Sequence, residues 1–149
     1  MKHNKLRKLA DQLARECLGL RLRMVHRAVG AIYDDALRPH HLRAGQMTLL
    51  ICVAYVGTIK PSRLSRLLHM EKSTLSRDVA VLQRQGWIEV ESDLQGPGQS
   101  LRLSPDGEKL LETAFPAWER AQHQAAELLG ETGVNVMHET AQKLGFPVL

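Results

Sequence analysis

Residues 60–86 read KPSRLSRLLHMEKSTLSRDVAVLQRQG, and this stretch decides the fold. Its first part predicts a short helix, because Pro61 suits a first helical turn and leucines follow at positions 64, 67 and 68. Its second part predicts a helix over about 72–85, because Leu75, Val79 and Leu82 recur at helical spacing. Gly86 can adopt the left-handed conformation that ends a helix. We therefore expect two helices joined by a tight turn.

The residues that follow predict a β-hairpin. Residues 87–91 (WIEVE) and 101–103 (LRL) alternate apolar and polar side chains as strands do, and residues 93–100 between them include two glycines and a proline. A new helix should begin next, since Ser104 can cap it and Pro105 fits its first turn. A helix-turn-helix followed at once by a hairpin is a winged helix-turn-helix, whose second helix can enter a DNA major groove about 12 Å wide.

Amphipathic helices are predicted on both sides of this module. Apolar residues recur every three or four positions from Leu6 to Ile32, which predicts one long helix that stops near Arg38. Residues 45–57 predict a helix that is apolar on nearly every side. A helix is expected from 105 to about 129 with a kink at Pro116, and a last amphipathic segment covers 134–144.

Length and composition exclude several classes of protein. With 149 residues, 44% of them hydrophobic, the chain can form one compact domain with a core but not a large multidomain enzyme. The longest uncharged stretch, residues 44–59, is shorter than the roughly 20 apolar residues that span a bilayer. No secretory signal or catalytic motif is recognisable. We therefore expect a cytoplasmic protein that is not an enzyme, needs no cofactor and does not associate with membranes.

Positive charge is concentrated in the first half of the chain. The net charge is +6 over residues 1–43, +4 over 60–86 and −6 over 87–149. The second predicted helix begins with cations and hydroxyls opposite its apolar stripe, and such groups contact phosphates and base edges. The residues expected to contact double-stranded DNA are Lys60, Ser62, Arg63, Arg66, Lys72, Ser73, Thr74, Ser76, Arg77, Arg84 and Arg102.

In their order and spacing, these elements resemble the MarR family of bacterial winged-helix transcription regulators. The resemblance rests on segments 64–68 (LSRLL), 73–77 (STLSR), 86–88 (GWI) and 101–107 (LRLSPDG), with Leu82 and Asp93. It implies a homodimer that binds a palindromic operator and is released by a small-molecule effector or an oxidant. The expected function is therefore sequence-specific transcriptional regulation, as a repressor that places its 72–85 helix in the major groove.

The expected fold class is accordingly mainly α with a small β-hairpin wing (α+β). By resemblance, residues 1–38 form an N-terminal dimerisation helix and residues 105–149 form C-terminal dimerisation helices. Residues 45–104 form the winged helix-turn-helix DNA-binding region. The three parts are expected to make one integrated domain.

The wing departs from the family pattern. Its tip reads QGPGQ at 95–99, where family wings usually carry arginine, and Val90 replaces a cation often found after the junction. Arg102 is the only basic residue between Arg84 and Lys109. Because each phosphate contact adds about one unit to the salt dependence of binding, we expect a weak contribution from the wing. The alternative is a winged-helix module with weak or no operator binding that acts through a protein partner.

The cysteines and histidines leave one further hypothesis. Cys17 lies on the apolar stripe between Leu13 and Leu20, which favours a small buried side chain. The resemblance offers a second interpretation, a thiol-based redox sensor, since peroxide-sensing relatives place a reactive cysteine in their first helix. Cys52 is expected in the core. The seven histidines do not have the spacing of metal ligands, so no metal site is expected.

Overall fold

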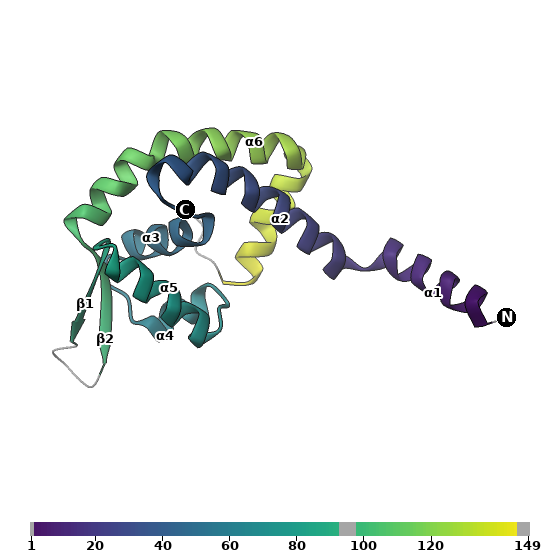
Figure 1. The fold of residues 1–149 in the computed structure, drawn as a ribbon, viewed down its shortest axis with the longest axis horizontal. Helices are drawn as coiled ribbons and strands as arrows, with labels where there is room; N and C mark the ends of the chain where they lie inside the picture. The colour runs from purple at the N-terminus through teal and green to yellow at the C-terminus, as the bar shows by residue number, and fades with distance from the viewer. Residues whose placement is uncertain (1, 93–97, 146–149) are drawn as a thin grey trace.

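The computed structural model describes residues 2–92 and 98–145, a mainly helical chain with one β-hairpin (Figure 1). Its helices are α1 (Lys2–Glu16), α2 (Leu18–Leu37), the 3-10 helix η1 (Arg38–His40), α3 (Ala44–Val56), α4 (Pro61–Leu67), α5 (Lys72–Arg84) and α6 (Pro105–Lys143). Strands β1 (Ile88–Ser92) and β2 (Gln99–Leu103) pair antiparallel. The expected fold class is confirmed. Within the described ranges, no helix is both long and apolar enough to cross a membrane.

The core lies where α3 meets the helix-turn-helix and the hairpin. Helix α3 supplies Leu49, Leu50 and Val53, and Cys52 is buried beside them, as predicted. The elements around α3 add Leu37, Leu64, Leu75, Leu82, Ile88, Leu101 and Ala114. Two backbone hydrogen bonds between Ile59 and Leu101, at 2.8 and 3.0 Å, also join strand β2 to the segment just before α4. One core therefore holds α4, α5 and the wing together.

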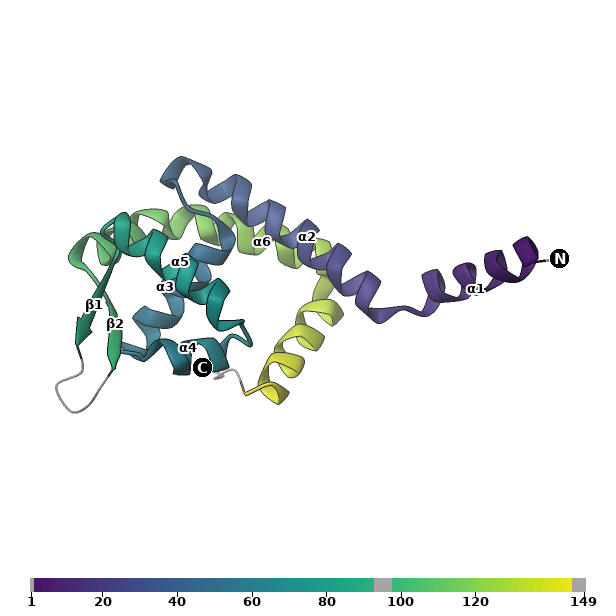
Figure 2. The same ribbon diagram turned by 60° about the horizontal axis from the view of Figure 1, so that its bottom comes forward.

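Helix α2 lies along the first part of α6, and α1 extends away from the rest of the molecule in both views (Figures 1 and 2). The leucines of α1 are exposed in this single chain: Leu6 by 66%, Leu9 by 53% and Leu13 by 58%. The apolar stripe predicted for the N-terminal region is thus present, and on α1 it faces solvent.

The N-terminal helix is not continuous, so the prediction of one long helix was wrong. The chain leaves helical geometry at Cys17, where φ is −68° and ψ is 104°. The Cys17 Sγ accepts a hydrogen bond from the Leu20 backbone N–H at 3.4 Å and so caps α2. Cys17 is exposed in the chain, against the expectation of a buried side chain. The apolar periodicity continues across the break, which is why the sequence pattern did not reveal it.

The bend in α6 also differs from the prediction. The non-helical residue inside α6 is Gly130, with φ 67° and ψ 167°, rather than Pro116. Such dihedral angles are essentially restricted to glycine. Pro116 lies on an exposed part of the helix, where water can bind the carbonyl group that proline leaves without a partner. Gly130 therefore separates the predicted last segment from the first part of α6.

Candidate nucleic-acid interface

The turn between α4 and α5 is fixed by a buried serine. The Ser65 side chain is 7% exposed, and its Oγ donates to the Met70 carbonyl oxygen at 2.8 Å. The Met70 N–H donates in return to the Ser65 carbonyl oxygen at 2.9 Å. His69 adopts a left-handed conformation with φ 49°, which reverses the chain. These contacts position the start of α5 against α4.

Helix α5 buries one face and exposes another. Leu75 and Leu82 are buried, whereas Ser73, Ser76 and Arg77 are exposed. The first turn also presents backbone N–H groups, which favour phosphate at a helix N-terminus. The predicted division of α5 into an apolar stripe and a polar face is therefore present.

The Arg77 side chain lies along the first turns of α5. Its Nε is 3.4 Å from the Ser73 carbonyl oxygen, and its Nη2 is 3.4 Å from the Thr74 Oγ1. These bonds are long and solvent-exposed, so they hold the guanidinium only weakly. Arg77 can exchange them for a phosphate or a base edge with little loss.

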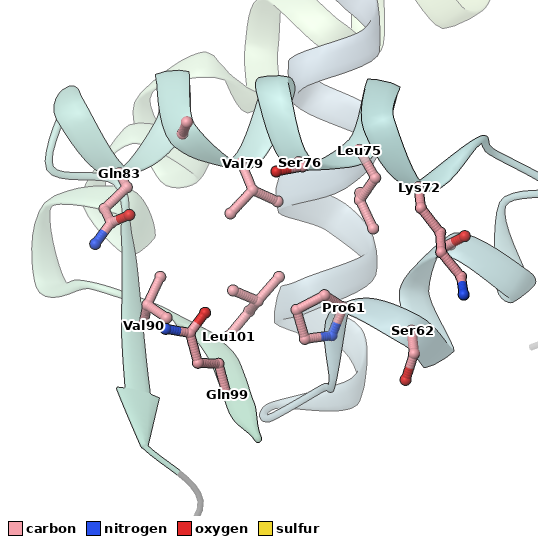
Figure 3. A pocket seen from close by; sticks show the side chains of 12 residues that line it. Pro61, Ser62, Lys72, Leu75, Ser76, Val79, Gln83, Val90, Gln99 and Leu101 are labelled. Carbon is pink, nitrogen blue, oxygen red and sulfur yellow. The ribbon is translucent and has the colours of Figure 1, made fainter. Parts of the chain in front are cut away.

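A groove of about 400 Å³ lies between α5 and the hairpin, next to the start of α4 (Figure 3). Apolar side chains line its inner part: Pro61, Leu75, Val79, Val90 and Leu101. Polar groups line the rest, namely Ser62, Ser65, Lys72, Ser76, Gln83 and Gln99. The polar side chains are of the kinds that contact phosphates and base edges.

Two groove residues, Gln83 and Gln99, were not among the predicted contacts. Sequence reasoning selected cations and hydroxyls, whereas glutamine can donate to phosphates and pair with adenine. A signal was available for Gln83, since it lies two helical turns beyond Ser76 on the same face. Gln99 pairs with Ser92, and only the register of the strands places it at the groove.

The structure brings part of the predicted contact set together. Ser62, Lys72 and Ser76 line the groove, and Ser73, Thr74 and Arg77 lie on the same first turns of α5. Arg63 and Arg66 are exposed on α4, Lys60 stands at its N-cap, and Arg84 is exposed in the last turn of α5. Arg102 does not line this groove.

Arg102 belongs to an ion-paired cluster on the outer face of the hairpin. It is directly opposite Glu89 in the register, while Val90 pairs with Leu101 on the face that lines the groove. Arg102 Nη2 is 2.5 Å from Glu89 Oε2, and Arg102 Nε is 2.6 Å from Glu91 Oε1. Residues 93–97, which include Asp93 and most of the predicted wing tip, lie outside the described residues.

A second cavity, of about 580 Å³, lies between α2, α3 and α6. Its wall is mostly apolar and includes residues on both sides of Gly130, such as Leu129 and Met137. Tyr33 and Gln122 line it, and the Tyr33 hydroxyl donates to Gln122 Oε1. Burial raises the pKa of Tyr33 and so keeps its phenol neutral.

The remaining chemically reactive side chains are separated. Cys52 is buried, and burial raises the pKa of its thiol, whereas Cys17 is exposed at the start of α2. Across residues 2–92 and 98–145, no group of three or more His, Cys, Asp or Glu is placed to hold a metal ion.

These elements define a winged helix-turn-helix protein with long helical extensions. The family model of the MarR family matches residues 42–95, which span α3, the helix-turn-helix and strand β1. Solved structures share its fold. One is a cysteine-to-serine mutant of MarR from E. coli complexed with operator DNA, with TM-score 0.78, 19% identity, and coverage of 89% of this chain and 96% of that one.

Two other structures are similar. A probable transcriptional regulator from Pseudomonas aeruginosa has TM-score 0.77 and 22% identity, and covers 88% of this chain and 98% of its own. The oxidised form of MarR from E. coli has TM-score 0.70 and 21% identity, with coverage of 89% and 98%. No curated protein sequence matched the chain.

Proposed function

We propose that the protein is a dimeric, sequence-specific DNA-binding regulator of transcription that acts as a repressor. The observation that carries this proposal is the groove between α5 and the wing, where the polar face of α5 meets Ser62 and Lys72 beside an apolar inner wall. Two comparisons support the proposal: residues 42–95 match the MarR family model, and a solved structure with a similar fold is complexed with operator DNA. A protein of this kind acts by binding rather than catalysis, in the cytoplasm.

The proposed contacts are those that lie in or beside the groove. They are Lys60, Ser62, Arg63, Arg66, Lys72, Ser73, Thr74, Ser76, Arg77 and Arg84, together with Gln83 and Gln99. Direct base contacts are assigned to Ser76 and Arg77, which are exposed on the first turns of α5, and phosphate contacts to the cations around them. Arg102 is left out of this proposed set because it pairs with two carboxylates and does not line the groove.

The exposed apolar stripe supports the dimer. Leu6, Leu9 and Leu13 on α1, and Val136 and Met137 near the end of α6, are all at least 40% exposed in the single chain. A second copy that covers these residues would remove them from water. In a dimer that binds a palindromic site, the two α5 helices lie about 34 Å apart, one turn of the duplex.

The apolar cavity between α2, α3 and α6 supports release by a small ligand. Its volume of about 580 Å³ is in the range of small-molecule sites. It adjoins the Gly130 bend and the Tyr33 to Gln122 bond between α2 and α6, so an occupant would alter how these helices pack. A ligand releases DNA if it binds the DNA-free arrangement more tightly.

The test is Arg77→Ala, measured against a duplex of the DNA upstream of the protein's own gene. Loss of one base contact should weaken specific binding by about 5- to 150-fold at fixed salt. Arg120→Ala on α6 is the control, since it removes the same charge from an exposed position on another helix. Unchanged binding by Arg77→Ala would refute the assigned role of α5.

The second candidate function is a winged-helix module that acts through a protein partner. The observation in its favour is that Arg102, on strand β2 of the wing, is paired with Glu89 and Glu91 rather than free to contact phosphate. Binding of the wild-type protein to upstream DNA that is no tighter than to a scrambled duplex would support this candidate over the first.

A further inference from the structure

The outer face of the wing carries a cation that two carboxylates already hold. Arg102 directs Nη2 to Glu89 and Nε to Glu91, at 2.5 and 2.6 Å, so two edges of one guanidinium are engaged. All three side chains are between 40% and 52% exposed. The cluster is therefore exposed to solvent. Its net charge is negative, because two carboxylates surround one guanidinium.

The cluster lies close to the proposed DNA groove. Glu89, Glu91 and Val90 line a surface hollow that also includes Gln83 of α5. Gln83 and Val90 line the groove between α5 and the wing as well. The carboxylates thus adjoin the residues at the hairpin end of the groove, where a duplex seated on α5 would pass.

We propose that Glu89 and Glu91 keep Arg102 from phosphate and make the wing repel DNA. This inference rests on the proposed function, because it concerns the hairpin that borders the same groove. A phosphate that approaches Arg102 meets a guanidinium with two occupied edges and two nearby negative charges.

The consequence is a low affinity for DNA of arbitrary sequence. Phosphate contacts supply essentially all non-specific binding, whereas contacts from α5 to base edges supply the difference between duplexes. A wing that contributes no phosphate contact weakens both kinds of binding by a similar factor. Phosphate contacts nevertheless make up the larger fraction of the free energy of non-specific binding. Discrimination then rests on α5.

The test compares the wild-type protein with the double variant Glu89→Gln/Glu91→Gln. Binding to the upstream duplex and to a scrambled duplex is measured from about 50 to 200 mM salt. Glutamine preserves size and removes charge. The variant should bind the scrambled duplex at least threefold more tightly at the lowest salt, with a salt slope steeper by about one. One added phosphate contact changes affinity by about 3.5-fold over this fourfold range of salt.

Three further variants identify the cause. Adding Arg102→Ala to the double variant should return the slope to its wild-type value, and Arg102→Ala alone should leave the wild-type slope unchanged. Glu112→Gln/Glu119→Gln, on the exposed surface of α6, makes the same change in net charge and should leave the slope unchanged. Circular dichroism of each variant checks that the fold is retained.

Three results would overturn the inference. They are an unchanged slope in Glu89→Gln/Glu91→Gln, an equal gain in the α6 control, and a slope that falls by about one in Arg102→Ala alone. The last result would mean that wild-type Arg102 contacts phosphate. Failure of the wild-type protein to prefer upstream over scrambled DNA would instead contradict the proposed function, since the slopes on scrambled DNA still test the wing.

Discussion

Replacing Gly107 with alanine should strongly destabilise the junction between the wing and α6. A Cβ at this position would lie 2.1 Å from the Trp87 carbonyl oxygen and 3.0 Å from its carbonyl carbon. Since close carbon to oxygen contacts are about 3.3 Å, the two backbone segments would have to separate by about 1 Å. The obstacle is backbone, so no change of side-chain rotamer relieves the clash.

The size of the effect follows from the hydrogen bonds at this junction. Ser104 N–H donates to the Trp87 carbonyl oxygen at 3.1 Å, and Ser104 Oγ donates to the Gly86 carbonyl oxygen at 2.5 Å. Losing both bonds costs about 1–3 kcal/mol, and residual strain adds about 1–3 kcal/mol. We therefore expect the free energy of unfolding to fall by about 2–6 kcal/mol.

Urea denaturation of the wild type and of Gly107→Ala, at one fixed protein concentration, measures the change. The matched control is Gly45→Ala, because Gly45 lies in the first turn of α3 and a Cβ there meets nothing within 4 Å. Gly45→Ala should leave stability unchanged or raise it by up to about 1 kcal/mol. A Gly107→Ala protein within about 1 kcal/mol of the wild type would refute the assignment of a close approach.

Three further predictions concern buried polar groups and thiols. Cys17 should react with a thiol reagent in the native protein and Cys52 only after unfolding, and equal labelling rates in mass spectrometry would contradict this. Burial raises the pKa of both Cys52 and Tyr33, so the folded chain retains protons that the unfolded chain releases, and Tm should fall as pH rises from about 8 to about 10. A flat Tm over that range would refute it. Tyr33→Phe removes the hydrogen bond to Gln122, and Ser65→Ala removes the hydrogen bond that fixes the turn between α4 and α5. Each substitution should lower the free energy of unfolding by about 1 kcal/mol, measured by urea denaturation. An unchanged free energy of unfolding would show that the hydrogen bond makes no net contribution.

The helix-turn-helix could be predicted from sequence because its signals are local. Helix α5 extends over Lys72–Arg84, in agreement with the predicted range of about 72–85. Gly86 has a φ of 77°, the positive value expected of a residue that ends a helix. Apolar residues at helical spacing, a proline in the first turn and a glycine after the last turn each act within a few residues. The same holds for Ser104, whose Oγ caps α6 by accepting from the Gly107 N–H at 3.0 Å.

The break at Cys17 and the absence of a kink at Pro116 could not be predicted, because the local signals conflict with their context. At Cys17 the apolar repeat runs on from Leu13 to Leu20, so periodicity predicts a continuous helix while the thiol caps a new one. At Pro116 the local rule predicts a kink, yet the lost backbone bond falls on an exposed part of α6. The break at Gly130, in contrast, agrees with the predicted end of the helix near residue 129.

The ion pairing of Arg102 could have been predicted from the sequence. The signal is the alternation of polar and apolar residues along the two strands, which a count of charges ignores. Glu89, Glu91 and Arg102 all occupy the polar positions of alternating strands. Since side chains alternate with a period of two, any register that keeps Ile88, Val90, Leu101 and Leu103 on the core face must place the three charges together on the other face. A cation in such a hairpin is best assigned first to its cross-strand carboxylates and only afterwards to DNA.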